Sequence, residues 1–178
     1  LKVYGVVWTT VFLFLGSLRM LNQLSMVYTD KVYDKNWTKV KRFSIMAGVL
    51  ISIIMVIVAL TPVGYFLLHR IIAVSKEVTD LAQQTILAFS VYPLIRAFRE
   101  SYWGVLMKQR TTKVIASAKT ANLIVVSLVV LIALGLLSLS TTIPAAVVGA
   151  IAFTLGELVE TIVIWRSTLN NDKCVVTE

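Results

Sequence analysis

Three charged residues interrupt an apolar part of the sequence between Tyr92 and Lys113. Arg96 precedes Arg99 by three residues and Glu100 by four, so a helix places all three on one face. Two guanidinium groups beside one carboxylate leave a net positive charge, and a guanidinium binds phosphate or carboxylate through two parallel hydrogen bonds. The alternative is a helix end near the headgroups, with the arginine tips in water. This alternative is stronger for Arg99 than for Arg96.

A second set of residues lies in the last apolar segment, AAVVGAIAFTLGELVETIVIW. Glu157 and Glu160 are three residues apart and can share a cavity in which one of them carries a proton. The alternative is a simple ion pair to Lys119 or to an arginine. Gly149 and Gly156 belong to a stripe of small residues in the same segment, which lets another helix approach closely.

The composition indicates that these charges lie within a membrane. The chain has 178 residues, is 58% hydrophobic and 15% charged, and has a mean hydropathy of +0.86. Soluble domains carry about 25% charged residues. A charge at the centre of a membrane helix costs about 2.5 to 3.5 kcal/mol, so such residues usually face the helix bundle or a wet cavity.

The apolar runs predict an all-α, polytopic membrane protein with about five transmembrane helices in one domain, residues 1–178. Runs of about 20 apolar residues match the thickness of a bilayer. Pro93 is expected to kink the third span. Residues 63–78 are too interrupted to cross, so an interfacial hairpin is expected there. The five predicted spans are residues 3–28, 43–60, 78–107, 121–139 and 144–165.

The net charge of +8 would suggest a nucleic-acid surface in a soluble protein. Here most Lys and Arg residues lie in the connections between apolar runs, so no nucleic-acid partner is expected. They are concentrated on the side that holds the C-terminus, which predicts a cytoplasmic C-terminus and an external N-terminus. Asn36 begins a formal glycosylation acceptor, NWT, on the predicted cytoplasmic side, where it should stay unmodified.

Motifs of soluble enzymes are absent from the sequence. It has no glycine-rich phosphate loop, no paired metal-ligand spacing and no nucleophile elbow. His69 is the only histidine and Cys174 the only cysteine. We therefore expect a protein that is not an enzyme and that needs no cofactor and no metal.

The order of the segments carries a resemblance to a known family. A basic connection, YTDKVYDKNWTKVKRF, is followed by a long span, the interfacial hairpin and VYPLIRAFRESYWGVLMKQRTTKVIASAKTANLIVV. The last of these contains Gly104, Leu106, a basic turn with Thr111, and Asn122 in an apolar helix. With the closing VVGAIAFTLGELVETIVIWR, this order resembles the C-terminal half of the multidrug/oligosaccharidyl-lipid/polysaccharide exporter superfamily. The RESYWGVLMKQRTTK segment is similar to its ankylosis-protein branch.

This resemblance implies a secondary transporter or flippase that works by alternating access. Its cargo would be a drug, a lipid-linked sugar, or a small anion such as pyrophosphate or citrate, and the arginines favour an anionic cargo. The five spans would be helices eight to twelve of twelve, so a missing N-terminal lobe or a partner chain is expected beside the membrane lipids. The residues expected to bind substrate are Arg96, Arg99 and Glu100, and those expected to couple an ion are Glu157 and Glu160.

A structural or assembly subunit that does not transport is the alternative. Its buried charges would only pair across an interface with another protein, and stripes of small residues serve that purpose equally well. A water-filled cleft that reaches Arg96 and Glu157 would favour transport. Dry pairing against a neighbouring chain would favour assembly.

Overall fold

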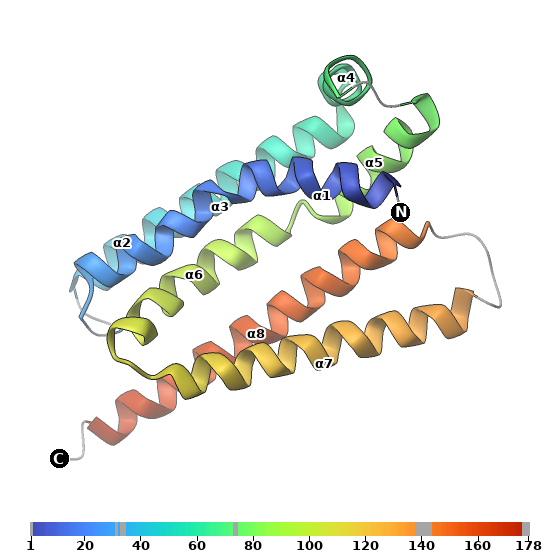
Figure 1. Ribbon diagram of the computed structural model, residues 1–178. Helices are drawn as coiled ribbons and strands as arrows, with labels where there is room; N and C mark the ends of the chain where they lie inside the picture. The colour runs from blue at the N-terminus through green and yellow to red at the C-terminus, as the bar shows by residue number, and fades with distance from the viewer. Residues whose placement is uncertain (1, 31, 33–34, 73–74, 138–143, 176–178) are drawn as a thin grey trace.

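The computed structural model describes residues 2–30, 32, 35–72, 75–137 and 144–175, which form helices joined by short turns (Figure 1). The prediction of an all-α protein is confirmed. The elements in chain order are α1 (Lys2–Leu15), η1 (Ser17–Arg19), α2 (Met20–Tyr28), α3 (Lys35–Leu60), α4 (Pro62–Phe66), η2 (Leu67–Ile71), α5 (Lys76–Ala88), α6 (Tyr92–Lys108), α7 (Thr112–Leu137) and α8 (Ala145–Val175).

Four stretches of helix in the described residues are long and apolar enough to cross a membrane: Val7–Tyr28, Lys35–Leu60, Thr112–Gly135 and Ala145–Thr168. They confirm a polytopic membrane protein. The first crossing combines α1, η1 and α2, because the residues at their junctions keep right-handed helical backbone angles. Residues 73–74 of the predicted interfacial hairpin and residues 138–139 of the predicted fourth span lie outside the described residues.

The predicted third span, residues 78–107, is divided into two helices in the structure. α5 ends at Ala88 and α6 begins at Tyr92. Between them, the Tyr92 N–H donates to the Phe89 carbonyl at 3.0 Å, a tight turn in place of the regular ladder. Pro93, which has no N–H, follows in the first turn of α6. The two helices together still run from the end near α4 to the opposite end of the molecule (Figure 1).

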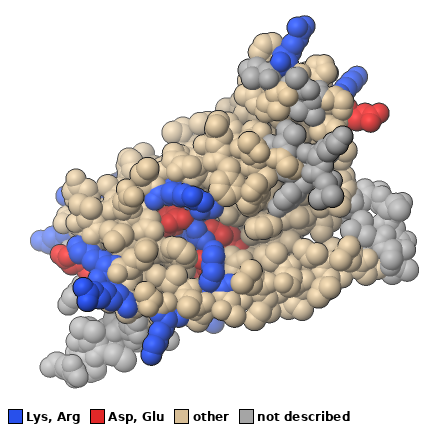
Figure 2. All heavy atoms as spheres, viewed as in Figure 1, with Lys and Arg blue, Asp and Glu red and all other residues tan. Residues whose placement is uncertain are grey.

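The connections and termini fall at two ends of the bundle. The N-terminus and α4 lie at one end, whereas the α2–α3 connection, the α6–α7 turn and the C-terminal end of α8 lie at the other (Figure 1). At this second end, Lys108 Nζ lies 2.6 Å from Asp30 Oδ1, and Gln109 Nε2 donates to the Asp30 carbonyl at 3.3 Å. Basic side chains gather there (Figure 2). That this end is cytoplasmic stays a prediction.

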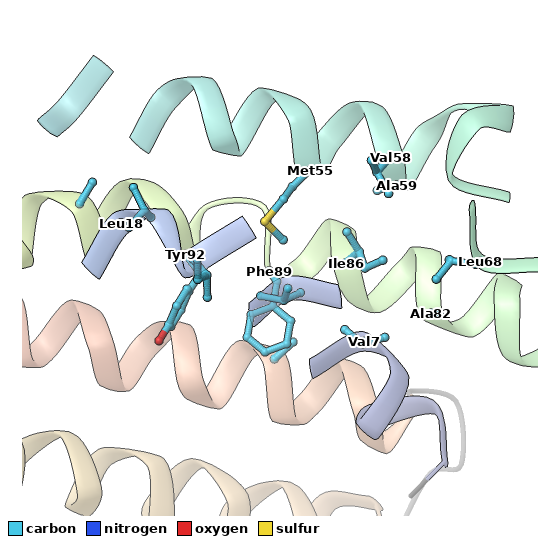
Figure 3. Packing of buried hydrophobic residues seen from close by; sticks show 14 of the residues in the cluster. Val7, Leu18, Met55, Val58, Ala59, Leu68, Ala82, Ile86, Phe89 and Tyr92 are labelled. Atoms are coloured by element: carbon cyan, nitrogen blue, oxygen red, sulfur yellow. The ribbon is translucent and has the colours of Figure 1, made fainter. Parts of the chain in front are cut away.

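An apolar core joins α1, α3, α5 and the first part of α8. Val7, Met55, Ile86 and Phe89 are fully buried in it and point toward one another (Figure 3). The Trp8 ring extends the core to α8, with its centroid 5.2 Å from that of Phe153. This core therefore lies beside α5, the first of the two helices into which the predicted third span is divided.

Glycines set the closest helix contacts. A Cβ on Gly48 of α3 would lie 2.7 Å from Ala97 Cβ of α6, and one on Gly104 of α6 would collide with the backbone of α2. On α8, a Cβ on Gly156 would lie 2.5 Å from Val126 Cγ2 of α7. Gly149 is half-buried two turns earlier in the small-residue stripe. α6 is thus packed tightly on α2 and α3, and α8 on α7.

Candidate functional site

The charged residues singled out in the sequence come together where α6 faces α8. In Figure 2, acidic and basic side chains gather in the middle of the face, over α6 and α8, apart from those at the two ends of the bundle. We call this set the charge network. Its members are Arg96, Arg99 and Glu100 of α6, Lys119 and Asn122 of α7, and Glu157 and Glu160 of α8.

Arg99 is the centre of the charge network. Its Nη1 lies 2.8 Å from Glu157 Oε1 and 3.0 Å from Glu160 Oε1, while its Nη2 donates to Glu100 Oε1 at 2.7 Å. Only 3% of the side chain is exposed. The alternative that Arg99 extends to the headgroups is therefore wrong, because three carboxylates hold it between α6 and α8.

Glu160 connects all three helices of the network. Lys119 Nζ and Asn122 Nδ2 of α7 donate to its Oε2 at 2.9 and 2.6 Å, and Arg99 of α6 donates to its Oε1. Its side chain is fully buried. Close packing at Gly156 allows these bonds, since a larger residue there would push α7 and its Asn122 away.

Arg96 is held more loosely than Arg99. Its Nε is 3.4 Å from Glu100 Oε1, one helical turn further along, and its Nη1 donates to the Tyr92 hydroxyl at 3.1 Å. Its side chain is 11% exposed. Both arginines keep a buried Nε without a hydrogen bond to a described residue, but Arg96 has one carboxylate partner where Arg99 has three, so Arg96 has more bonding capacity left for another anion.

Glu157 is the least bonded carboxylate of the network. Its only ion pair among the described residues is with Arg99, and its Oε1 is buried without a hydrogen bond of good geometry. The same Arg99 nitrogen is shared with Glu160. Buried carboxylates normally satisfy several hydrogen-bond positions, so Glu157 is poorly compensated compared with Glu160.

The charges of the network balance. Arg96, Arg99 and Lys119 oppose Glu100, Glu157 and Glu160, which corrects the expectation of a net positive site. The sequence interpretation counted the charges of one helix, whereas the balancing carboxylates of α8 lie about 60 positions later in the chain. Glu157 and Glu160 are the carboxylates predicted to couple an ion. Each of them makes an ion pair with Arg99, and Glu160 also pairs with Lys119, as the alternative of a simple ion pair predicted.

Two aromatic residues of the site were missed by the sequence interpretation. The Trp103 ring lies 4.8 Å from Arg99 Cζ and 5.5 Å from Lys119 Nζ, so it stacks against two cations. Tyr92 accepts the hydrogen bond from Arg96. A signal was present, because each aromatic residue lies four positions from its arginine and therefore on the same helix face.

The hollows beside the network are apolar. A groove of about 340 Å³ between α3, α6 and α8 has one polar side chain, Thr161, whose hydroxyl donates to the Glu157 carbonyl. A second groove, of about 330 Å³, lies between the first crossing and α3. Neither of these two grooves is lined by Arg96 or Glu157, and the ion pairs of the network lie within the chain. The first groove is lined by Ile45, Leu94, Ile95, Phe98, Leu158, Thr161 and Ile162.

Long apolar helices around buried and mutually compensating charges define a polytopic membrane protein. The chain belongs to the family of the progressive ankylosis protein (ANKH), whose model matches residues 1–176. This family is associated with membrane transport of small anions such as pyrophosphate or citrate. No solved structure matches the chain. The match supports the ankylosis-protein branch of the resemblance, and membership of the wider exporter superfamily stays a prediction.

Proposed function

We propose that the chain is part of a secondary transporter that moves a small polyvalent anion, with Arg96 as the principal anion ligand. The observation that carries this proposal is the loose bonding of Arg96, which has one carboxylate partner at 3.4 Å and is more exposed than Arg99. A guanidinium there offers a flat pair of donors that suits phosphate or carboxylate oxygens. Arg99 assists by holding the surrounding carboxylates, and Glu100 limits the local positive charge.

The mechanism we propose is alternating access, in which two bodies rock about a central site. In this chain α6 packs mainly on α2 and α3, and α8 mainly on α7; the two groups meet at the charge network and at an apolar cluster that includes Leu106 and Ile164. An anion that binds Arg96 changes the hydrogen bonds and ion pairs of the charge network between α6 and α8. It can therefore prefer one arrangement over another, which is the condition for any coupled movement.

The proposal includes an N-terminal lobe or a partner chain that completes the pathway, as the predicted superfamily relationship implies. It also keeps the cytoplasmic C-terminus predicted from the charge distribution. It assigns no catalytic step and no cofactor to the chain, and it does not require lipid-linked cargo.

The test is transport of labelled pyrophosphate and citrate by proteoliposomes that contain the full-length protein. Arg96→Lys keeps the charge but loses the bidentate hydrogen bonds, which are worth about 1.5 to 3 kcal/mol. We expect a tenfold to hundredfold weaker affinity. Arg70→Lys is the matched control, since Arg70 is exposed on η2 and outside the network. Unchanged transport by a stable Arg96→Ala protein would contradict the proposal.

A structural or assembly role is the second candidate. It is favoured by the mutual compensation of the network charges and by the apolar lining of the neighbouring groove, but the partners of these charges lie within the chain and not on a neighbouring chain. This role predicts that Arg96 variants lose thermal stability without any transport defect per folded molecule. Stability and transport must therefore be measured on the same preparations.

A further inference from the structure

The balance of charge in the network raises a difficulty for any anion that enters it. Three cations already face three carboxylates, and apart from Lys119 these groups are almost fully buried. An added anion would leave uncompensated negative charge in a region of low dielectric constant, which is strongly unfavourable. The two terminal nitrogens of Arg99 face three carboxylates, so an anion that binds these nitrogens must displace a carboxylate, although the buried Nε of Arg99 has no hydrogen-bond partner in the described part of the chain.

We propose that the transported anion replaces Glu157 as an ion-pair partner of Arg99, and that Glu157 takes up one proton when it is released. The inference rests on the proposed function, because it assumes that the anion binds at the arginines. The Arg99–Glu157 ion pair breaks, an ion pair between Arg99 and the anion forms, and a proton from water on the side of entry forms an O–H bond on Glu157. The proton cancels one negative charge of the anion, so the net charge added to the network is one unit smaller than the charge of the anion alone.

The bonding of the three carboxylates selects Glu157 for this role. Glu160 accepts from Arg99, Lys119 and Asn122 on two helices. Glu100 accepts a 2.7 Å hydrogen bond from Arg99 and is an immediate neighbour on the same helix. Glu157 has one ion pair, made to a nitrogen that it shares, and a buried Oε1 without a hydrogen bond. Its release breaks the fewest bonds.

The surroundings of Glu157 are consistent with a protonated form. A neutral carboxylic acid is tolerated in a dry site far better than an unpaired carboxylate. After Glu157 takes up a proton, the remaining groups are three cations and two carboxylates, whose one net positive charge offsets one negative charge of the bound anion. The titratable and charged groups that face Glu157 are Tyr92, Arg96, Arg99 and Glu100 from α6, Lys119 from α7 and Glu160 from α8.

The experiment measures binding of inorganic pyrophosphate, with citrate as a second probe, to the purified full-length protein across a range of pH. If one proton enters with the anion, the affinity of the wild type should change about tenfold more per pH unit than that of Glu157→Gln over the range where the carboxylate titrates. The titration of the probe itself is common to both proteins and cancels in this comparison. Glu77→Gln, an exposed carboxylate at the start of α5, should keep the wild-type slope.

Proton uptake in a weakly buffered solution gives an independent measurement. The wild type should take up about one proton per bound anion beyond the protons released or bound by the probe alone. No extra proton would overturn the proposal without reference to any variant. Glu157→Asp, which keeps a titratable group, should keep the pH slope if Glu157→Gln does not fold.

The possible failures are distinguishable. If Arg96→Lys weakens binding but wild type and Glu157→Gln have equal pH slopes, the anion site stands and the proton exchange is wrong. If the wild type binds neither probe, the proposed function and the proton exchange fail together.

Discussion

The apolar core around Phe89 and the charge network around Arg99 lie on α5 and α6, the two helices into which the predicted third span is divided, and they hold the bundle together in different ways. The core depends on shape, because lipid tails are as apolar as its side chains and only close packing favours helix contact. The charge network depends on pairing, because each buried charge is tolerated only while its partners remain. The core therefore stabilises one arrangement of helices, whereas the network can respond to a ligand.

The strongest test of this contrast is removal of Glu160, the carboxylate of the network that accepts the most hydrogen bonds. Glu160→Leu leaves Arg99 and Lys119 short of a partner inside the membrane, and we expect a loss of about 3 to 5 kcal/mol in unfolding free energy. Thermal unfolding of the purified protein measures it. Glu160→Gln, which still offers an oxygen to Lys119 and Asn122, should lose less. Equal losses in the two variants would show that charge pairing at Glu160 is unimportant.

Truncation of a side chain in the apolar core should lower the stability of the protein without affecting transport. Met55 is fully buried against the apolar cluster, so Met55→Ala leaves a cavity and should cost about 2 to 5 kcal/mol. Transport per folded molecule should not change. Met46→Ala is the control, because Met46 lies on the exposed face of the same helix. A changed anion affinity in Met55→Ala would mean that the two regions are coupled.

Substitution of a glycine at a close helix contact is expected to lower the stability somewhat less than truncation of a core side chain. Gly104→Ala places a methyl group against the backbone of α2, which must shift, at a cost of about 1 to 3 kcal/mol. Gly135→Ala is the matched control, since a Cβ there meets nothing within 4 Å. Thermal midpoints of the two variants should differ clearly. A stable Gly104→Ala protein would show that α2 and α6 are less tightly packed than described.

The smallest effect on stability is expected for the ion pair between Asp30 and Lys108, outside the predicted spans. A hydrogen bond from Lys108 and the attraction of its charge lower the pKa of Asp30 below its ordinary value. The contribution of this pair is therefore complete above the ordinary pKa and is lost only as the pH falls below about 4. Asp30 is fully exposed, so Asp30→Asn should change thermal stability at neutral pH by no more than the measurement error. A clear loss at pH 7 would assign the pair a larger role in holding this end of the bundle.

The helices could be predicted from the sequence because apolar runs of membrane length are a local property. Pro93 likewise indicated a disturbance in the third crossing, but the location of the break depends on the bond between Tyr92 and Phe89. The relative burial of Arg96 and Arg99 could not be predicted. It depends on which helix packs against each face of α6, and the partners of Arg99 on α8 lie about 60 positions away.

The distance along the chain between Arg99 and its partners also has a consequence for the synthesis of the protein. At about 5 to 20 residues per second, the carboxylates of α8 are made roughly 3 to 12 seconds after α6. During that interval the two arginines have only Glu100 as an ionic partner within α6. α6 is then a poor candidate for release into lipid on its own. It is expected to stay beside the insertion machinery until the hairpin of α7 and α8 is complete, so the order in which helices leave that machinery differs from the order in which they are made.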